Sequence, residues 1–272
     1  KAEGFPHVPY RELTSPGELA PALESMGYPA VLKTAAFGYD GKGQIRLEGP
    51  EDLEPEALWN QMGEPDQVVL EKWISFSCEM SAICARSISG NATVFPPAEN
   101  IHRNHILHQS VLPARVTPEV VEQAEALARN LAEKLAVVGL LGVEFFVTQT
   151  GEVLINAMPP RPHNSGHYTQ EGCARSQFEQ HLRMVLGMEG VPQTLQSPTV
   201  MTNLLGDLWQ PDQRPAWELL LQHPGVHLHL YEKGQARKGR KMGHFNLRGA
   251  DADTALAEAD RLWKALGGQL RE

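Results

Sequence analysis

One stretch decides how this chain is interpreted: Leu154-Ile-Asn-Ala-Met-Pro-Pro-Arg-Pro-His-Asn-Ser-Gly-His-Tyr-Thr169. It begins as an apolar strand, Val153–Ile155, and leaves that strand through prolines, which cannot donate to a sheet ladder. The loop then carries five polar or basic side chains: Arg161, His163, Asn164, Ser165 and His167. Taken alone, the loop is best interpreted as a polar surface turn. Two other stretches favour a binding site instead, a lysine strand with a glycine loop at Lys33–Gln44 and an acidic strand at Gly142–Val147.

The composition is that of an ordinary globular protein. The chain has 272 residues, 42% of them hydrophobic and 21% charged, which is enough for one large domain or two smaller ones. A formal net charge of -9 argues against a non-specific nucleic-acid binder. Three cysteines without a CxxC pair fit a reducing, cytoplasmic compartment better than a disulfide scaffold. No signal peptide or membrane-spanning apolar run is visible, so we expect neither nucleic acid nor a membrane as a partner.

Hydrophobic periodicity predicts a mixed α+β chain. Alternation predicts strands at Ala30–Lys33, Gln44–Leu47, Gln67–Ile74, Ser77–Ser87, Asn91–Phe95, Gln109–Leu112, Gly142–Thr148, Glu152–Ile155, Thr199–Leu205, Val226–Tyr231 and Gly243–Leu247. Helical spacing and capping residues predict helices at Ser15–Met26, Ala57–Met62, Thr117–Leu135, Gln177–Leu186, Ala216–Leu221 and Thr254–Leu266. We interpret Pro96–His108 as a polar, histidine-bearing segment and Pro192–Pro198 as a linker.

A glycine-rich loop follows the first predicted strand. Lys33 stands at the strand end, ahead of Gly38-Tyr-Asp-Gly-Lys-Gly-Gln44. Glycines at this density allow backbone N–H groups to converge on an anion. The loop is not a Walker A motif, because it lies inside a hairpin and lacks the following Lys-Ser/Thr and helix. It could cover a triphosphate, and a plain hairpin turn is an equally good interpretation of the glycines alone.

An acidic residue stands in the middle of an apolar strand. Glu144 lies between Val143 and Phe145, where a carboxylate is costly unless it is paired or binds a cation. Mg²⁺ that bridges nucleotide phosphates takes such oxygen ligands. Across the predicted hairpin, a second carboxylate would be expected directly after Asn156, but the chain carries Ala157 there.

Two further patterns have a functional and a structural interpretation. The strand end at Val69–Ile74 could read the edge of an adenine, with Glu79 placed for ribose hydroxyls, or could be an ordinary strand with surface charges. His227 and His229 alternate on one strand and could face a shared pocket, although structural histidines are the commoner case.

Taken in order, these motifs resemble the ATP-grasp enzymes and, more narrowly, the 5-(carboxyamino)imidazole ribonucleotide synthase family of purine biosynthesis. The broader resemblance rests on Leu32-Lys33, Gly38–Gln44, Glu71–Ile74, Glu79–Ser81, Asn100–His102 and Gly142–Glu144. The narrower one rests on Arg161–His167, Ser176–Arg183 and Gly239–His244. The resemblance covers nearly the whole chain. It implies an ATP-grasp fold, in which two α+β subdomains clamp ATP, with a small C-terminal β-rich domain.

The resemblance also implies a division of the chain. We expect an ATP-grasp domain over residues 1–195, with a smaller lid-like subdomain at about 30–75, and a C-terminal domain over 196–272. The family's N-terminal domain is expected to be absent ahead of Lys1.

The site residues are likewise implied by the resemblance. Those implied to bind ATP are Lys33, Gly38, Tyr39, Asp40, Gly41, Lys42, Gly43, Gln44, Glu71, Lys72, Trp73, Ile74, Glu79, His102, Asn156 and Ala157. Those implied to line the bicarbonate and aminoimidazole side, as catalytic residues, are Arg161, His163, Asn164 and Ser165. Lys233, Arg240 and Lys241 suit the phosphate of the ribonucleotide, and Glu144 suits Mg²⁺.

The implied reaction is the ATP-dependent carboxylation of 5-aminoimidazole ribonucleotide with bicarbonate, through carboxyphosphate. ATP and Mg²⁺ are the implied cofactors, and a homodimer is the implied assembly. Two departures from the family pattern stand out: Asn156-Ala157 where Asn-Glu is usual, and Ala35-Ala36 where basic residues are usual. They leave open a catalytically impaired nucleotide-binding pseudo-enzyme. Another ATP-grasp carboxylase or ligase is a further alternative.

Overall fold

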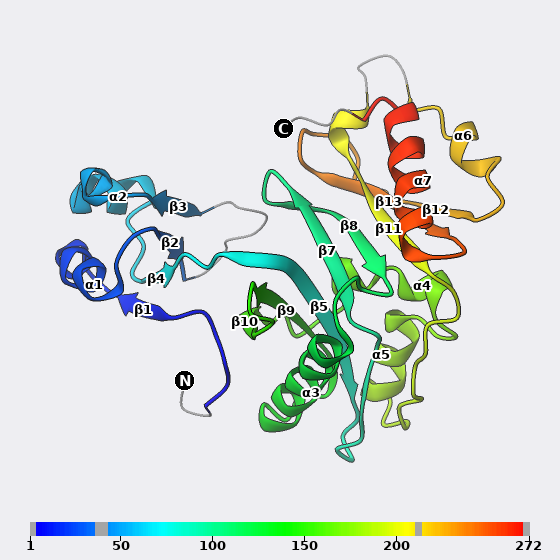
Figure 1. The fold of residues 1–272 in the computed structure, drawn as a ribbon, viewed down its shortest axis with the longest axis horizontal. Helices are drawn as coiled ribbons and strands as arrows, with labels where there is room; N and C mark the ends of the chain where they lie inside the picture. Colours follow the sequence, from blue (N-terminus) through cyan, green and yellow to red (C-terminus); the bar gives the residue numbers. More distant parts are fainter. Residues whose placement is uncertain (1–3, 36–42, 210–213, 269–272) are drawn as a thin grey trace. The chain divides into compact units, whose positions relative to one another are not determined.

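The computed structural model describes residues 4–35, 43–209 and 214–268. It divides into two compact units (Figure 1). The first unit comprises Lys1–Ser77 with Asn104–Ile106, and the second comprises Cys78–Arg103 with Leu107–Glu272.

The first unit is built on a four-stranded antiparallel sheet. Its strands, in spatial order, are β1 (Tyr10–Leu13), β4 (Val68–Lys72), β2 (Ala30–Thr34) and β3 (Gln44–Leu47). Its helical segments are η1 (Pro16–Glu18), α1 (Leu19–Met26), η2 (Pro50–Asp52) and α2 (Pro55–Gln61). Alternate strand residues such as Leu32 and Leu70 are fully buried with Leu23 of α1 and Trp59 of α2. The other sheet face is therefore left to the polar residues of the same strands.

The second unit is built on a nine-stranded sheet. Its main path runs through β10 (Val153–Ala157), β9 (Gly139–Thr148), β5 (Phe76–Arg86), β7 (Ala98–Arg103), β8 (Ile106–Leu112), β11 (Thr199–Leu205), β13 (Lys241–Arg248) and β12 (Val226–Leu230). A short strand, β6 (Ala92–Val94), pairs with β5 outside this path. Because β11 pairs with β8, the C-terminal strands extend the same sheet.

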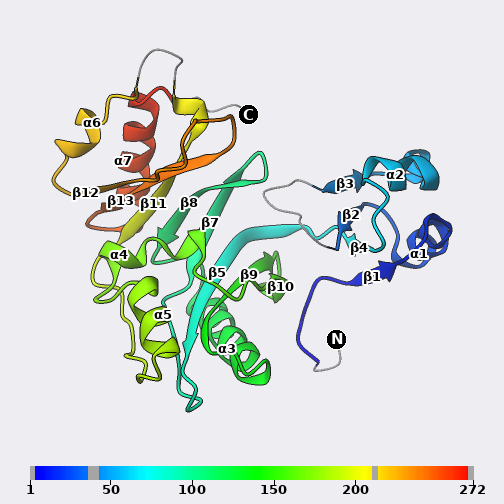
Figure 2. The ribbon, with the colours of Figure 1, turned by 180° about the vertical axis from the view of Figure 1, so that it is seen from behind.

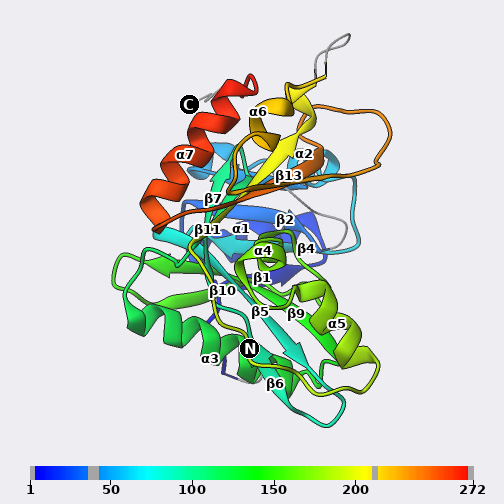
Figure 3. The same ribbon diagram turned by 90° about the vertical axis from the view of Figure 1, so that its right-hand side faces the viewer.

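Helices cover both ends of this sheet. α3 (Pro118–Lys134) and α5 (Gln177–Val185) both contact β9, from the two sides seen in Figure 3. α7 (Ala252–Ala265) packs along β11 and β13, and α6 (Glu218–Leu221) lies beside β12 (Figure 2). The remaining helical turns are η3 (Asn164–Gly166), α4 (Thr169–Gly172) and η4 (Gly206–Leu208). None of the described helices combines the length and the apolar character needed to cross a bilayer.

The structure confirms most of the strands and helices expected from periodicity, and it corrects one segment. The interpretation of Pro96–His108 as merely a polar segment was wrong, because it contains β7 and the start of β8. Polar residues of β7 are buried through hydrogen bonds: Asn100 accepts from the Ser110 hydroxyl at 2.9 Å, and Glu99 accepts from Arg115 Nε at 2.9 Å. A strand buried in this way shows no apolar alternation in its sequence.

Candidate active site

In the first unit, Lys33 and Glu71 form a salt bridge on the polar face of the sheet. Lys33 lies opposite Val69 and Glu71 opposite Val31, and antiparallel partners share a face, so both charged side chains project from the same side. Lys33 Nζ is 2.5 Å from Glu71 Oε2, and the two side chains are 30% and 18% exposed. The pair thus presents a half-buried cation on the face that the core leaves free.

The rest of the predicted nucleotide residues in this unit surround that pair. Gln44 lies opposite Lys33 on β3, and the Gly43 carbonyl accepts a hydrogen bond from Thr34 N–H. The N–H groups of Lys72 and Trp73 donate to main-chain carbonyls, so they are not available to an adenine. Ile74 follows as a half-buried residue. The predicted flap residues Gly38, Tyr39, Asp40, Gly41 and Lys42 lie outside the described residues.

In the second unit, the residue predicted for the ribose faces a histidine. Glu79 on β5 lies opposite Asn100 on β7, and His102 is two residues further along the same face. His102 Nδ1 is 3.0 Å from Glu79 Oε1, and each side chain is 21% exposed. The two residues predicted to lie near the nucleotide are therefore brought together.

The predicted metal ligand lies at the end of the β9–β10 pair. Ala157 is directly opposite Glu144, and the register shifts between Ile155 and Ala157, which places a bulge at Asn156. Glu144 Oε1 is 3.5 Å from His163 Nε2. The acidic strand and the loop Arg161–His167 therefore meet at this point.

Hydrogen bonds fix the tautomer of the neutral His163 ring. The Ser81 hydroxyl donates to Ser165 Oγ at 2.7 Å, so the Ser165 hydroxyl proton is directed to His163 Nδ1, 2.8 Å away. Nδ1 also accepts from the Ser165 N–H. The neutral ring therefore carries its proton on Nε2, the atom that faces Glu144. Burial lowers the pKa of His163 to about 3, and the charges of Arg161 and Lys241 act in the same direction.

Asn164 is held by a reciprocal amide pair. Its Nδ2 donates to Asn203 Oδ1 at 2.9 Å, and Asn203 Nδ2 donates back to Asn164 Oδ1 at 2.8 Å. Asn203, which is fully buried on β11, also donates to the Leu107 carbonyl at 2.9 Å. Asn203 was not predicted to be a site residue. A polar residue inside the buried run Thr199–Leu205 was the signal that could have found it.

Basic side chains gather around the loop. Arg161 is exposed and donates to the Pro162 carbonyl at 3.0 Å, and Arg240 donates to the Gln235 carbonyl at 3.3 Å. Lys233 Nζ lies 5.1 Å from the centre of the Tyr231 ring. Burial, with smaller contributions from the charges of His229, Lys241 and Lys233, lowers the pKa of His167 to about 4. Two of the three predicted phosphate residues, Lys233 and Lys241, are thus electrostatic neighbours of the loop.

Three imidazole rings stack beside the loop. His244 lies between His167, at 4.7 Å between ring centres, and His229, at 4.5 Å. His229 Nε2 is 3.0 Å from Glu171, and the Tyr231 hydroxyl is 2.6 Å from His244 Nδ1. Burial lowers the pKa of His244 to about 2, with the neighbouring histidines acting in the same direction. The column is therefore uncharged at His244 and His167 near neutral pH.

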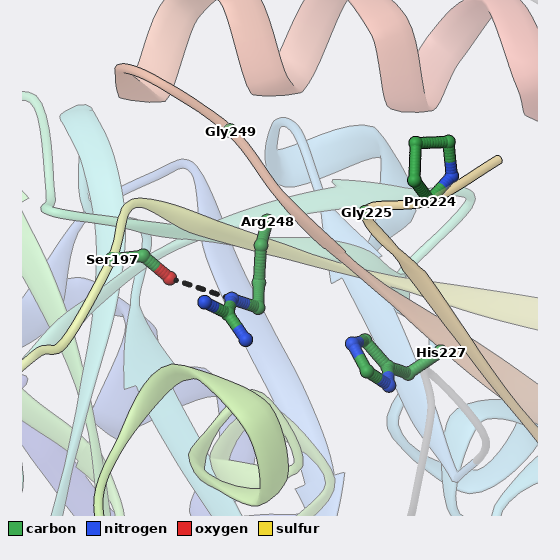
Figure 4. A pocket seen from close by; sticks show the side chains of 6 residues that line it. All are labelled: Ser197, Pro224, Gly225, His227, Arg248 and Gly249. Atoms are coloured by element: carbon green, nitrogen blue, oxygen red, sulfur yellow. Dashed lines mark hydrogen bonds between the residues drawn. The ribbon is translucent and has the colours of Figure 1, made fainter.

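A separate cavity of about 380 Å³ lies at the far end of β12 and β13. Figure 4 shows its lining: Ser197, Pro224, Gly225, His227, Arg248 and Gly249. Arg248 Nε donates to Ser197 Oγ at 3.1 Å. None of the six residues belongs to the predicted site, and of the two alternating histidines only His227 lines the cavity.

At the predicted metal position the described residues offer one carboxylate ligand, that of Glu144. Among residues 4–35, 43–209 and 214–268, no three His, Cys, Asp or Glu side chains gather as a metal site. Mg²⁺ at a nucleotide is held by one or two carboxylates, with phosphates and waters completing its shell. Glu144 would supply one of these ligands, and the methyl group of Ala157 cannot supply another.

Comparisons with known proteins identify the family of the chain. The ATP-grasp domain family matches residues 1–178, and the phosphoribosylaminoimidazole carboxylase C-terminal domain family matches residues 199–258. The N5-carboxyaminoimidazole ribonucleotide synthase of Bacillus subtilis is 42% identical over 264 residues, which cover 97% of this chain and 67% of that protein. The Vibrio cholerae synthase is 41% identical, and the match covers 88% of this chain and 62% of that protein.

Solved structures give the same result. A crystal structure of an N5-carboxyaminoimidazole ribonucleotide synthetase in complex with ADP has a TM-score of 0.87 at 42% identity, covering 98% of this chain and 70% of that one. The Aspergillus clavatus synthase in complex with ADP and 5-aminoimidazole ribonucleotide has a TM-score of 0.86 at 32% identity, with the same coverage. This chain thus spans about two thirds of the length of these relatives. On these matches, the chain belongs to the N5-carboxyaminoimidazole ribonucleotide synthase family of ATP-grasp proteins.

Proposed function

We propose that this chain catalyses the ATP-dependent carboxylation of 5-aminoimidazole ribonucleotide with bicarbonate, giving 5-(carboxyamino)imidazole ribonucleotide. The observation that carries the proposal is the loop Arg161–His167, which meets Glu144 through His163 and is anchored to β11 through Asn164. The ligands of the Aspergillus clavatus relative, ADP and 5-aminoimidazole ribonucleotide, support the assignment of the substrates.

In this proposal the polar face of the first unit binds the phosphates and the adenine, and in the second unit Glu79 is the residue for the ribose. Lys33 neutralises phosphate charge, and Gly43 and Gln44 belong to the flap. Glu71–Ile74 contact the adenine through groups other than the paired N–H groups of Lys72 and Trp73. Lys33 can serve phosphates because its ammonium lies on a half-exposed sheet face, where Glu71 holds it in place. Arg240, Lys241 and Lys233 bind the ribonucleotide phosphate, for which guanidinium and ammonium donors are suited.

The reaction has two substitution steps. A bicarbonate oxygen attacks the γ-phosphorus of ATP and ADP leaves, which gives carboxyphosphate; the exocyclic amine then attacks its carbon, and phosphate and a proton leave. Mg²⁺, held by Glu144, would neutralise charge on the phosphates. Carboxyphosphate reacts with water, so the site must exclude water.

His163 serves this reaction as a hydrogen-bond donor in our proposal. Its Nδ1 lone pair is taken by Ser165, which leaves the Nε2–H as its active group. A fixed N–H stabilises negative charge that develops on an oxygen, and it does so without reorganising during the reaction. The low pKa keeps the His163 ring neutral, so the ring acts as a hydrogen-bond donor and not as a positive charge.

Phosphate release from ATP tests the proposal directly. We expect release that requires both bicarbonate and 5-aminoimidazole ribonucleotide and that falls with His163→Phe. Release that is indifferent to 5-aminoimidazole ribonucleotide, but stimulated by another amine or carboxylate acceptor, would assign the chain to another ATP-grasp carboxylase or ligase.

Ala157 favours a second candidate function, a nucleotide-binding protein with impaired turnover. The position opposite Glu144 carries no oxygen ligand, and losing one carboxylate weakens the hold on the metal. Under this alternative, the chain binds ATP with Mg²⁺ but releases phosphate no faster with the ribonucleotide than without it. Isothermal titration with ATP and Mg²⁺, run beside the phosphate assay, separates the two candidates.

A further inference from the structure

Gln177, the first residue of α5, holds the loop at both main-chain polar groups of His163. Its side chain is fully buried. Oε1 accepts from the His163 N–H at 2.9 Å, and Nε2 donates to the His163 carbonyl at 2.8 Å. The remaining Nε2 proton points to His167 Nδ1, 3.0 Å away. One amide therefore contacts two histidines of the same loop.

The orientation of this amide follows from chemistry. The His163 N–H can only donate and its carbonyl can only accept, so oxygen and nitrogen of the Gln177 amide cannot be exchanged. Because the group that faces His167 Nδ1 is then an N–H donor, Nδ1 must be an acceptor. The neutral His167 ring consequently carries its proton on Nε2.

Stacking and close packing hold the His167 ring in place beside the Gln177 amide. His167 stacks on Phe178 at 5.6 Å and on His244 at 4.7 Å between ring centres, with interplanar angles of 28° and 25°. A Cβ added at Gly166 would lie 2.7 Å from Gln177 Oε1, so only glycine lets the loop approach the amide this closely. Stacking thus sets the plane of the ring, and Gln177 sets its protonated nitrogen.

The second ring nitrogen is available to a ligand. Within the described part of the chain, no acceptor pairs with His167 Nε2, and this atom is not among the buried unpartnered ones. The ring lies two residues beyond Ser165, on the loop that we assign to bicarbonate and the aminoimidazole. An anionic or carbonyl oxygen is the group that an imidazole N–H would contact there.

We propose that Gln177 is a positioning residue that holds His167 as the Nε2–H tautomer, so that His167 donates a hydrogen bond to an oxygen of the substrate or intermediate. The role of His167 in carboxylation rests on the proposed function, whereas its tautomer does not. The side-chain amide of Gln177 hydrogen-bonds to His163 and His167 and acts through these two residues.

The test reads the tautomer by NMR of the full chain labelled with ¹⁵N-histidine, at pH 7.5, with the His167→Asn variant used to assign the resonances. In the unsubstituted chain we expect a pyridine-type Nδ1 and a pyrrole-type Nε2 at His167. Gln177→Glu replaces the donor with a carboxylate, so we expect the proton to move to Nδ1. Gln177→Met removes the partner, and we expect averaging between tautomers.

Gln180→Met is the matched control. Gln180 lies on the same helix, is equally buried and donates to the Val191 carbonyl at 2.5 Å, away from the loop. We expect it to leave the His167 resonances unchanged, even if it lowers stability as much as Gln177→Met does. In turnover assays, Gln177→Glu should lower kcat by roughly 10- to 100-fold with KM for ATP unchanged, because only the loop geometry is altered.

Two results would overturn the inference: a protonated Nδ1 at His167 in the unsubstituted chain, or no change of tautomer in Gln177→Glu. An unsubstituted chain without turnover would instead count against the proposed function, because the NMR result does not depend on catalysis.

Discussion

Ala157 lies directly across the β9–β10 pair from Glu144, one residue beyond the bulge at Asn156. Directly opposed residues of an antiparallel pair have Cβ atoms about 4.5–5.5 Å apart, so a carboxylate at position 157 would be within reach of a cation bound to Glu144. The predicted metal site is therefore one substitution away from a two-carboxylate site.

Ala157→Glu should raise the affinity for Mg²⁺ in the presence of nucleotide by about tenfold, or ~1.4 kcal/mol. Without metal the two carboxylates repel each other, so the variant should unfold at a lower temperature than the unsubstituted chain until Mg²⁺ is added. Thermal unfolding with and without Mg²⁺-ATP measures both effects, and Ala157→Gln is the uncharged control. If Mg²⁺ shifted the unfolding temperatures of the glutamate and glutamine variants equally, the assignment of Glu144 as a metal ligand would be wrong.

The Asn164–Asn203 amide pair should be visible in a double-mutant cycle. Asn203→Ala removes three hydrogen bonds and leaves the Leu107 carbonyl without its partner, which should cost about 1–3 kcal/mol of unfolding free energy. Asn164→Ala in the Asn203→Ala background should cost clearly less than it does alone. Urea unfolding of the four proteins gives the coupling energy. If the unfolding free energies lost in the two single variants simply added in the double variant, the two amides would not stabilise each other.

Lys33 should matter for nucleotide binding more than for stability. Its salt bridge with Glu71 is partly exposed, and such pairs stabilise a fold by roughly 0–1 kcal/mol. We expect Lys33→Met to weaken ATP binding at least about tenfold by calorimetry while shifting the urea midpoint little. Lys264→Met, on the exposed side of α7, is the charge-matched control. ATP affinities that are alike in the two variants would exclude Lys33 from the phosphate site.

Buried neutral histidines should make the fold sensitive to mild acid. The pKa of His108 is lowered to about 3, mainly by burial, and those of His163, His167 and His244 to about 3, 4 and 2. A histidine whose folded pKa is depressed stabilises the fold fully above the unfolded pKa of about 6.5, and this contribution is lost as the pH falls toward the folded pKa. Each such group adds up to ~1.4 kcal/mol per pH unit to the slope.

Urea unfolding between pH 7.5 and 5.5 measures this slope. His108→Gln should reduce the slope by the share of one histidine, because His108 is 3% exposed and packs edge-on against Trp263, away from the predicted site. A stability that is constant over this range would contradict the burial of these rings as neutral groups.

Much of the fold could be predicted from the sequence because most strands bury one apolar face. The hairpin of β2 and β3 and the helix α3 show the expected periodicity, and both are present. β7 was missed because it buries Glu99 and Asn100 through hydrogen bonds with partners distant in the sequence. Burial by hydrogen bonding leaves no periodic apolar signal.

The site could be predicted only in part, for a similar reason. Loop residues such as His163 stand out in the sequence as a polar run after prolines. The roles of Gln177 and Asn203 could not be predicted, because they depend on contacts with a loop that lies 14 and 39 residues away along the chain. A polar residue inside an apolar run can be noticed in the sequence, but its partner is known only once the fold brings the two together.

We propose above all that this chain forms a carboxylated ribonucleotide from ATP, bicarbonate and 5-aminoimidazole ribonucleotide. ¹³C NMR with ¹³C-bicarbonate tests it most directly. We predict an ATP-dependent carbamate resonance that grows in step with ADP, with one phosphate released per carbamate formed. ATP and ribonucleotide binding without any carbamate resonance, at any Mg²⁺ concentration, would contradict the claim.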